Sequence, residues 1–305
     1  MIDVLICLIS GWGLWFSTSR FVSSCETCAQ YLGLSASAAG ALLIAVLTSM
    51  PELVVTVQAT LMGQYSMAFG NIVGSVWANT CLILGVLAMI RPVRIELEHL
   101  NLDQIIHMLL VLIAMVGIYI GVSWVLIVCA MVALYGVYCV RQLPSVQTFI
   151  PSADLQFSGR VLIEMLLYAI MLLFSAYGLI LGASGLASWL GMSPYWVGLT
   201  VVALGTSLPE FSAALVSHHR GQDAWVLGNA LGSNVFLLAV VLPMMMMLSP
   251  VEMQSNWLPE LSLMGLMFVV VFGALRYFDR GCLAINRIEG AFLILMYFGY
   301  LFFII

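Results

Sequence analysis

The chain has 305 residues, of which 63% are hydrophobic and only 8% are charged, and its formal net charge is −5 at pH 7. Because a soluble domain carries about 25% charged residues, this composition excludes a soluble globular protein and predicts a surface that faces lipid. The net charge identifies no partner, since the charged residues lie mostly between apolar stretches. Membrane lipids are the expected surroundings, and no nucleic-acid partner is expected.

Ten stretches are apolar enough to predict membrane spans, because a spanning helix needs about 20 mostly apolar residues. In chain order they are Ile2–Ser19, Ser37–Met62, Met67–Ile90, Ile105–Gly121, Ser123–Val140, Val161–Leu181, Pro194–Ser217, Trp225–Leu248, Leu258–Leu275 and Ile288–Ile305. We therefore expect an all-α polytopic membrane protein with ten transmembrane helices. The first stretch lacks a basic leader and a small-residue cleavage motif, which predicts a retained helix and not a signal peptide.

The basic residues, all of them arginines, fall on one side of the predicted topology. They lie in the connections that follow spans one, three, five, seven and nine: Arg20, Arg91, Arg94, Arg141, Arg160, Arg220, Arg276, Arg280 and Arg287. The positive-inside rule makes this side cytoplasmic, so both termini are expected outside. The expected location is the plasma (inner) membrane of a bacterium or archaeon, and the expected functional unit is a monomer.

The sequence repeats itself at an offset of 158 residues, the separation of Glu52 from Glu210. The residues of the first copy that recur are Gly33, Ser35, Gly40, Thr48, Ser49, Pro51, Glu52, Gly63, Gln64, Gly70, Asn71, Gly74 and Ser75. This predicts a first five-helix repeat over residues 1–140 with its core at 33–90. A cytoplasmic connecting loop follows at 141–160, and a second repeat at 161–305 has its core at 191–248. Because an odd number of spans separates the copies, the second should be inverted in the membrane, as in many secondary transporters.

Two matching segments place a carboxylate beside a proline in the middle of a span. They are Ala45-Val-Leu-Thr-Ser-Met-Pro-Glu52 and Ala203-Leu-Gly-Thr-Ser-Leu-Pro-Glu210. Proline lacks an N–H, so each segment should break its helix and leave a main-chain carbonyl unpaired, which is tolerated at membrane depth only in protein or around a water-filled cavity. Carboxylate, carbonyl and hydroxyl oxygens are the ligands of hard cations such as Ca²⁺ and Na⁺. The segments therefore predict a cation site, against the alternative of a proline kink with a snorkelling glutamate.

A second motif, Gly70-Asn-Ile-Val-Gly-Ser, recurs as Gly228-Asn-Ala-Leu-Gly-Ser. The GxxxG spacing by itself indicates close packing of helices in lipid. In the first copy, however, Asn71, Ser75 and Asn79 are spaced i, i+4, i+8, which puts three polar side chains on one face of the helix. We expect this face to lie against the broken helices and to lend oxygens to the site.

Together these paired motifs resemble the two repeats of the sodium/calcium exchanger family. The resemblance implies antiport of Ca²⁺ against Na⁺, or against H⁺ in relatives, with no cofactor and no enzymatic activity. It implies carboxylate ligands from Glu52 and Glu210. The further ligands that it implies are the carbonyls of Ala45, Thr48, Ala203 and Thr206, the hydroxyls of Ser49, Ser207, Ser75 and Ser233, and the amide of Asn79.

One position departs from the family pattern. Asn79 corresponds to Leu237 in the second repeat, where family members commonly carry an acidic or amide residue. Two glutamates give the site a charge of about −2, which one Ca²⁺ or two monovalent ions neutralise. An alternative is therefore a proton-coupled exchanger, or one for another divalent cation, with altered stoichiometry.

Rival function classes have less support in the sequence. An intramembrane protease would need a Ser–His pair, two aspartates or HExxH within the spans, and the sequence contains none of them there. A channel usually repeats its pore around a subunit axis, whereas inverted halves favour a transporter. Cys25 and Cys28 form a lone CxxC that we expect to be inert. We expect His218 and His219 to be a solvated pair in a cytoplasmic loop.

Overall fold

The structure is a computed structural model and describes residues 2–31, 46–94, 97–142, 159–248, 257–277 and 284–304. The described part of the first half is helical except for short connections and one strand. Its elements are α1 (Ile2–Tyr31), α3 (Met50–Leu61), α4 (Tyr65–Trp77), the π-helical turn η1 (Ala78–Ile83), α5 (Leu84–Ile90), β1 (Val93–Arg94), α6 (Leu97–Ile120) and α7 (Trp124–Gln142).

The described part of the second half repeats this order. Its elements are α8 (Gly159–Leu190), α9 (Pro194–Val197), the π-helical turn η3 (Gly198–Val202), α10 (Ala203–Thr206), α11 (Leu208–His219), α12 (Asp223–Phe236), the π-helical turn η4 (Leu237–Val241), α13 (Leu242–Leu248), α14 (Leu258–Tyr277), β2 (Ala284–Ile285) and α15 (Arg287–Ile304). The 158-residue offset relates α3 to α11, α4 to α12 and η1 to η4.

Among the described residues, five helical stretches are long and apolar enough to cross a membrane: Ile2–Phe21, Tyr65–Ile90, Gly159–Leu190, Val226–Leu248 and Arg287–Ile304. A sixth is obtained if the bent pair Pro194–Thr206 and Leu208–His219 counts as one span, and three shorter apolar helices lie in α6, α7 and α14. Every predicted span contains helix. The all-α membrane fold is therefore confirmed, while the count of ten remains a prediction.

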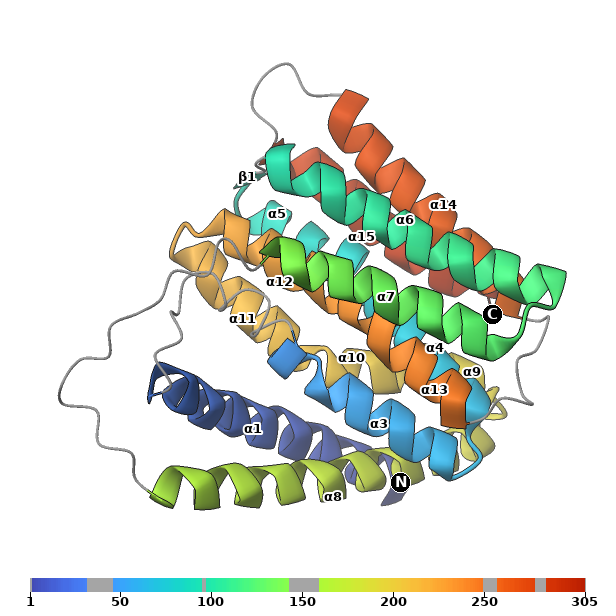
Figure 1. The fold of residues 1–305 in the computed structure, drawn as a ribbon. Coiled ribbons are helices and arrows are strands. Elements are labelled where there is room, and N and C mark those ends of the chain that lie inside the picture. Colours follow the sequence, from blue (N-terminus) through green and yellow to red (C-terminus); the bar gives the residue numbers. More distant parts are fainter. Residues whose placement is uncertain are drawn as a thin grey trace.

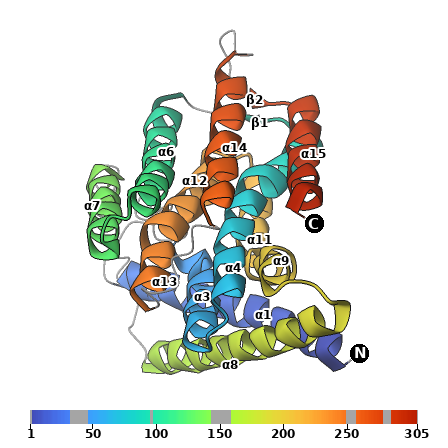
Figure 2. The same cartoon turned by 90° about the vertical axis from the view of Figure 1, so that its right-hand side faces the viewer.

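The helices form a central group with other helices packed around it (Figure 1). The centre is made by α3, α4, α11 and α12: α3 packs on α4, α11 packs on α12, and α4 contacts α12 across the two halves. The long helices α1 and α8 lie side by side along one edge and run across the direction of the others in the second view (Figure 2). On the other side, α6 packs on α14 and α15 packs on α5. The repeat motifs thus occupy the middle of the molecule.

Two glycines explain how closely the central helices approach. A Cβ added at Gly74 of α4 would overlap the main-chain carbonyl of Leu199, and one added at Gly198 would overlap that of Met67. Only residues without a side chain allow these two backbones to touch, as in small-residue contacts within membranes. The predicted packing role of GxxxG in α4 therefore agrees with the structure.

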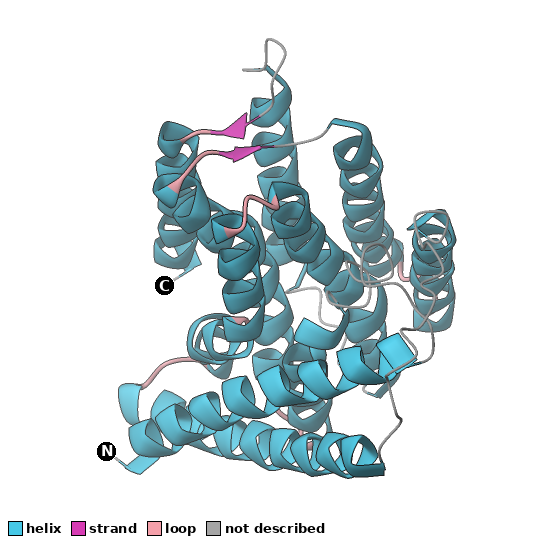
Figure 3. Ribbon diagram, turned by 90° about the vertical axis from the view of Figure 1, so that its left-hand side faces the viewer, coloured by secondary structure: helices cyan, strands magenta, loops and turns pink. Residues whose placement is uncertain are grey.

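A small polar junction joins the halves at one end of the molecule. Here β1 pairs with β2 in antiparallel register, with Val93 opposite Ile285 (Figure 3). Beside this ribbon, the Arg91 guanidinium donates to the Asp223 carboxylate at 2.7 Å and to the main-chain carbonyl of His218 at 2.8 Å. The ribbon and the ion pair connect segments that lie on opposite sides of the chain's midpoint.

Candidate cation-binding site

The predicted helix breaks occur one residue before each Met/Leu–Pro pair. Ser49 has φ −84° and ψ 9°, and Ser207 has φ −82° and ψ 7°, so both leave helical geometry at equivalent places. In the second half the axis bends by 45° between Pro194–Thr206 and Leu208–His219. Pro209 cannot donate to the carbonyl four residues before it, which is why the helix restarts there.

Each break positions one glutamate in the first turn of a new helix. Glu52 lies at the start of α3 and Glu210 at the start of α11, and both are fully buried. A helix N-terminus carries partial positive charge, which favours a carboxylate. The preceding helical segment ends at the same break. A helix C-terminus and a helix N-terminus therefore meet beside each glutamate.

The two glutamates are held by serines of the opposite half. Ser49 Oγ donates to Glu210 Oε1 at 2.8 Å, and Ser207 Oγ donates to Glu52 Oε1 at 3.0 Å. The contacts are reciprocal between equivalent residues, which is the mark of a two-fold relationship between the halves. Glu52 and Glu210 are also close enough to interact electrostatically.

Threonines and asparagines form a second reciprocal set around the glutamates. Thr48 Oγ1 donates to Asn229 Oδ1 at 3.3 Å, and Thr206 Oγ1 donates to Asn71 Oδ1 at 3.2 Å. Asn71 Nδ2 donates in turn to the main-chain carbonyl of Glu52 at 3.4 Å, and Asn229 Nδ2 makes the matching bond to Glu210 at 3.3 Å. The asparagines therefore tie α4 and α12 to the breaks. Asn71 belongs to the polar face that the sequence predicts beside the site, whereas neither asparagine is among the ligands that the family resemblance implies, although both recur at equivalent positions.

Four buried oxygen atoms on α3, α4, η1 and α11 have no hydrogen-bond partner among the described residues. They are Glu52 Oε2, Glu210 Oε2, Ser75 Oγ and Asn79 Oδ1. Unpaired buried acceptors are uncommon, and each calls for an explanation such as an ion. An oxygen set of carboxylate, hydroxyl and amide carbonyl suits hard cations and not soft metals. The described residues contain no group of three or more His, Cys, Asp or Glu side chains that could hold a metal ion.

Three further predicted ligands are Ala203, Ser233 and Ala45. Ala203 lies at the break, but its carbonyl already accepts from the Thr206 hydroxyl at 3.1 Å and from the Ser207 amide at 3.0 Å. Ser233 is buried on α12. Ala45 falls outside the described residues.

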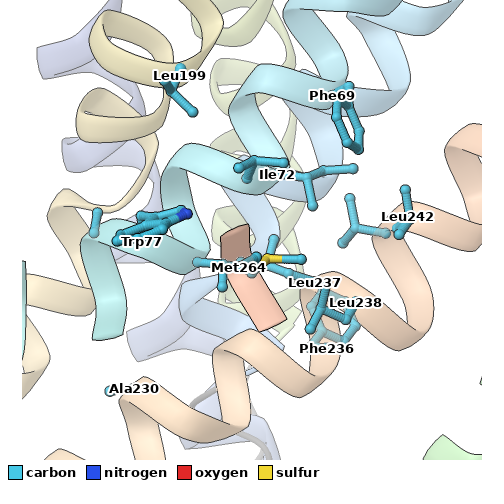
Figure 4. Close-up of a cluster of buried hydrophobic side chains, with 14 of the residues drawn as sticks. Phe69, Ile72, Trp77, Leu199, Ala230, Phe236, Leu237, Leu238, Leu242 and Met264 are labelled. Carbon is cyan, nitrogen blue, oxygen red and sulfur yellow. The ribbon is translucent and has the colours of Figure 1, made fainter. Parts of the chain in front are cut away.

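Leu237, the apolar residue that corresponds to Asn79 in the second repeat, is fully buried at the start of η4. Figure 4 shows it among the side chains of Ile72, Phe236, Leu238 and Met264. This position is therefore part of the hydrophobic core in the second half. The equivalent residue of the first half, Asn79, is polar and donates to Asn234 Oδ1 at 3.3 Å. The sequence predicts no role for Asn234, because the equivalent residue of the first repeat is the apolar Val76.

The prediction that His218 is solvated is wrong. His218 ends α11 with 1% of its surface exposed, and its Nδ1 lies 3.0 Å from Asp223 Oδ1. The expected loop is only a short turn between α11 and α12, so the packed end of α11 carries His218 into contact with Arg91. His219 is exposed, as expected. The side chains of Cys25 and Cys28 lie outside the described part of the structure.

Known proteins resemble this chain over both of its halves. Residues 2–143 and 161–305 match the sequence pattern of the family described as sodium/calcium exchanger protein. The chain belongs to the sodium/calcium exchanger family. The match spans both halves of the chain, including both breaks.

Several relatives resemble this chain over nearly its whole length. A putative antiporter CaxA of Alkalimonas amylolytica is 29% identical, covering 94% of this chain and 93% of its own. The sodium/calcium exchanger MaX1 of Methanosarcina acetivorans is 25% identical, covering 98% and 97%. Among solved structures, the sodium-calcium exchanger NCX_Mj aligns with a TM-score of 0.67 at 25% identity over 97% of each chain. The H⁺/Ca²⁺ exchanger CAX shares the fold, with a TM-score of 0.79 at 15% identity over 98% of this chain and 82% of its own.

Proposed function

We propose that the chain is a secondary antiporter that exchanges Ca²⁺ for Na⁺ at a site formed by Glu52 and Glu210. The observation that carries this proposal is the reciprocal pair of Ser–Glu hydrogen bonds. These bonds hold one oxygen of each carboxylate, and the other oxygen has no partner among the described residues. Two buried carboxylates are costly unless a cation neutralises them. Ser75 and Asn79 add neutral oxygens on the helix that Asn71 ties to the Glu52 carbonyl.

The inverted arrangement of the halves supports transport in preference to static binding. Each carboxylate is held by a hydroxyl from the other half, so a rotation of one half against the other changes the contacts of both glutamates together. Sites at the interface of inverted repeats, built on discontinuous helices, are typical of alternating access. The same cations can therefore be bound from one side of the membrane and released to the other.

A proton-coupled cycle is the second candidate, and Leu237 is the observation that favours it. Leu237 and the apolar side chains drawn around it in Figure 4 supply no oxygen ligand for a further sodium ion. With two carboxylates available, two protons can replace one Ca²⁺ as readily in charge as two sodium ions can. In this case the coupling ion, and not the calcium site, differs from the leading proposal.

The deciding experiment is uptake of radioactive calcium into vesicles that contain the purified protein. An outward sodium gradient and an outward proton gradient are imposed separately, each with the membrane potential clamped at zero. Uptake driven by sodium alone supports the leading proposal, and uptake driven by protons alone supports the second. No uptake under either gradient, from correctly folded protein, contradicts both.

We also propose that both termini face outward and that residues 141–160 form a cytoplasmic loop, since all arginines lie on one predicted side. Reporter fusions after Ile305 and within 143–158 test this. A reporter that works only outside the cytoplasm is expected to be active when fused after Ile305. A reporter that works only in the cytoplasm is expected to be active when inserted within 143–158. The reverse pattern contradicts the orientation without affecting the site.

A further inference from the structure

A chain of three buried polar side chains joins the two halves beside the candidate site. Asn79 Nδ2 donates to Asn234 Oδ1 at 3.3 Å, and Asn234 Nδ2 donates to Thr80 Oγ1 at 2.7 Å. All three residues have no exposed surface. Asn79 and Thr80 belong to η1 in the first half, whereas Asn234 lies near the end of α12 in the second.

This chain of hydrogen bonds breaks the two-fold symmetry of the site. The serine–glutamate and threonine–asparagine contacts all occur twice, but Asn234 corresponds to Val76, and Thr80 corresponds to Leu238. The equivalent turn η4 reads Leu237-Leu-Ala-Val-Val and carries no polar side chain. The positions equivalent to Asn79, Asn234 and Thr80 are Leu237, Val76 and Leu238, so this chain of hydrogen bonds occurs once and has no symmetric copy.

The π-helical turn explains how two consecutive residues reach the same neighbour. In a regular α-helix successive side chains point about 100° apart, because 3.6 residues complete a turn. A π-helical turn is wider and changes the register of the residues that follow, and such turns are frequent at functional sites. Here η1 begins at Ala78, so Asn79 and Thr80 both contact Asn234 while Asn79 remains one turn beyond Ser75.

The direction of these hydrogen bonds leaves one oxygen atom of Asn79 without a partner among the described residues. Asn79 uses its amide N–H on Asn234, and its carbonyl oxygen Oδ1 is buried without a partner among the described residues. Ser75 Oγ, one turn earlier on the same face, is in the same condition. An amide that turned over would place N–H groups where the oxygen now lies, and an N–H cannot ligate a cation.

We propose that Asn234, supported by Thr80, is a positioning residue that holds the Asn79 amide with its oxygen toward the transported cation. This inference rests on the proposed function, since it assumes that the free Oδ1 of Asn79 serves the Glu52 and Glu210 site. It adds to that site a residue that contacts no cation itself. Partners that orient a ligand typically change metal affinity by about 10–100-fold when they are removed.

The test is a double-mutant cycle on Ca²⁺ affinity, measured by calorimetry on the purified full-length protein. Asn234→Leu is expected to weaken Ca²⁺ binding about tenfold. Asn79→Leu should weaken it at least as much, and the double variant no further than Asn79→Leu alone, because Asn234 acts only through Asn79. If the two losses multiply in the double variant, Asn234 does not act by orienting Asn79 and the proposal is overturned.

A second background separates orientation from general damage. Asn79→Asp places two equivalent oxygens at the position, so no orientation is needed, and adding Asn234→Leu to it should change Ca²⁺ affinity less than twofold. Thr80→Val keeps the shape of the side chain and removes only the hydroxyl, so it tests the same chain if Asn234→Leu fails to fold. It is expected to weaken Ca²⁺ binding several-fold in the native background and not in Asn79→Asp. Unchanged affinity in folded Asn234→Leu, or equal losses in both backgrounds, overturns the proposal.

The result also distinguishes this inference from the proposed function. If the wild-type protein binds Ca²⁺ and Glu52→Gln abolishes it while Asn234→Leu has no effect, only the role of Asn234 is wrong. If the folded wild-type protein binds no Ca²⁺, the proposed function fails and the role of Asn234 fails with it.

Discussion

The hydroxyl of Ser207 lies 3.0 Å from a carboxylate oxygen of Glu52, although 155 residues separate them in the chain. The equivalent contact between Ser49 and Glu210 spans 161 residues. Each half therefore supplies a glutamate to the candidate site and a hydroxyl that holds the glutamate of the other half. A substitution of either serine or either glutamate therefore alters a contact between the two halves.

Replacing either glutamate by glutamine tests the site most directly. Glu52→Gln and Glu210→Gln each remove one negative charge, while the amide oxygen can still accept from the opposite serine. We expect calcium uptake to fall at least 100-fold in each, because a buried divalent ion would keep an uncompensated charge. Uptake in vesicles is the measurement. Glu164→Gln, which removes a carboxylate from an exposed pair with Arg160, is the matched control and should transport normally.

Exchange should be electroneutral if only Glu52 and Glu210 carry the charge of the transported ions. Leu237 is apolar and fully buried, so it contributes nothing to a third monovalent ion. A three-for-one cycle moves one net charge and responds to voltage by about 2.3 kcal/mol per 100 mV. Flux measured under a clamped potassium–valinomycin potential is therefore expected to be independent of that potential. A steep response to voltage contradicts this account of Leu237.

The close approach of α4 to η3 predicts an unusual cost for a single methyl group. In Gly74→Ala the added Cβ would overlap the Leu199 carbonyl and lie 2.6 Å from Ala203 Cβ. We expect the free energy of unfolding to fall by about 1–3 kcal/mol, as for other overpacked sites. The thermal unfolding midpoint in detergent measures the change. Gly136→Ala is the control, since nothing lies within 4 Å of its added Cβ, and helix propensity favours alanine there.

The junction of Arg91 with Asp223 should stabilise the contact between the halves. The ion pair is 2.7 Å long, with 6% of the Asp223 side chain and 42% of the Arg91 side chain exposed. Asp223→Asn removes the charge and is expected to lower the free energy of unfolding by about 1–3 kcal/mol, less than for a fully buried pair because water screens Arg91. Thermal unfolding again provides the measurement. Glu164→Gln, which affects an exposed i,i+4 pair, should change it by no more than about 0.5 kcal/mol. Equal effects of the two variants contradict a structural role for the junction.

The sequence by itself determined the membrane character, the positions of the helices and the paired breaks. Hydropathy and the missing N–H of proline are local properties, so Pro51 and Pro209 predicted both discontinuities without any knowledge of contacts. The internal repeat supplied the second copy of each motif. It also drew attention to Leu237, a position where the copies differ in polarity beside the candidate site.

Only the tertiary structure decided which side chains meet. The hydroxyl partner of Glu52 is Ser207 and not the nearby Ser49, because the two-fold arrangement of the halves brings each break against the other. Asn234 lies outside the repeat pattern, and it acquires a partner only because the wide turn η1 brings Asn79 and Thr80 to it. His218 reads as a loop residue until the end of α11 packs against Arg91. Local sequence sets the conformation of each segment, whereas the pairing of residues more than a hundred positions apart depends on how whole helices pack.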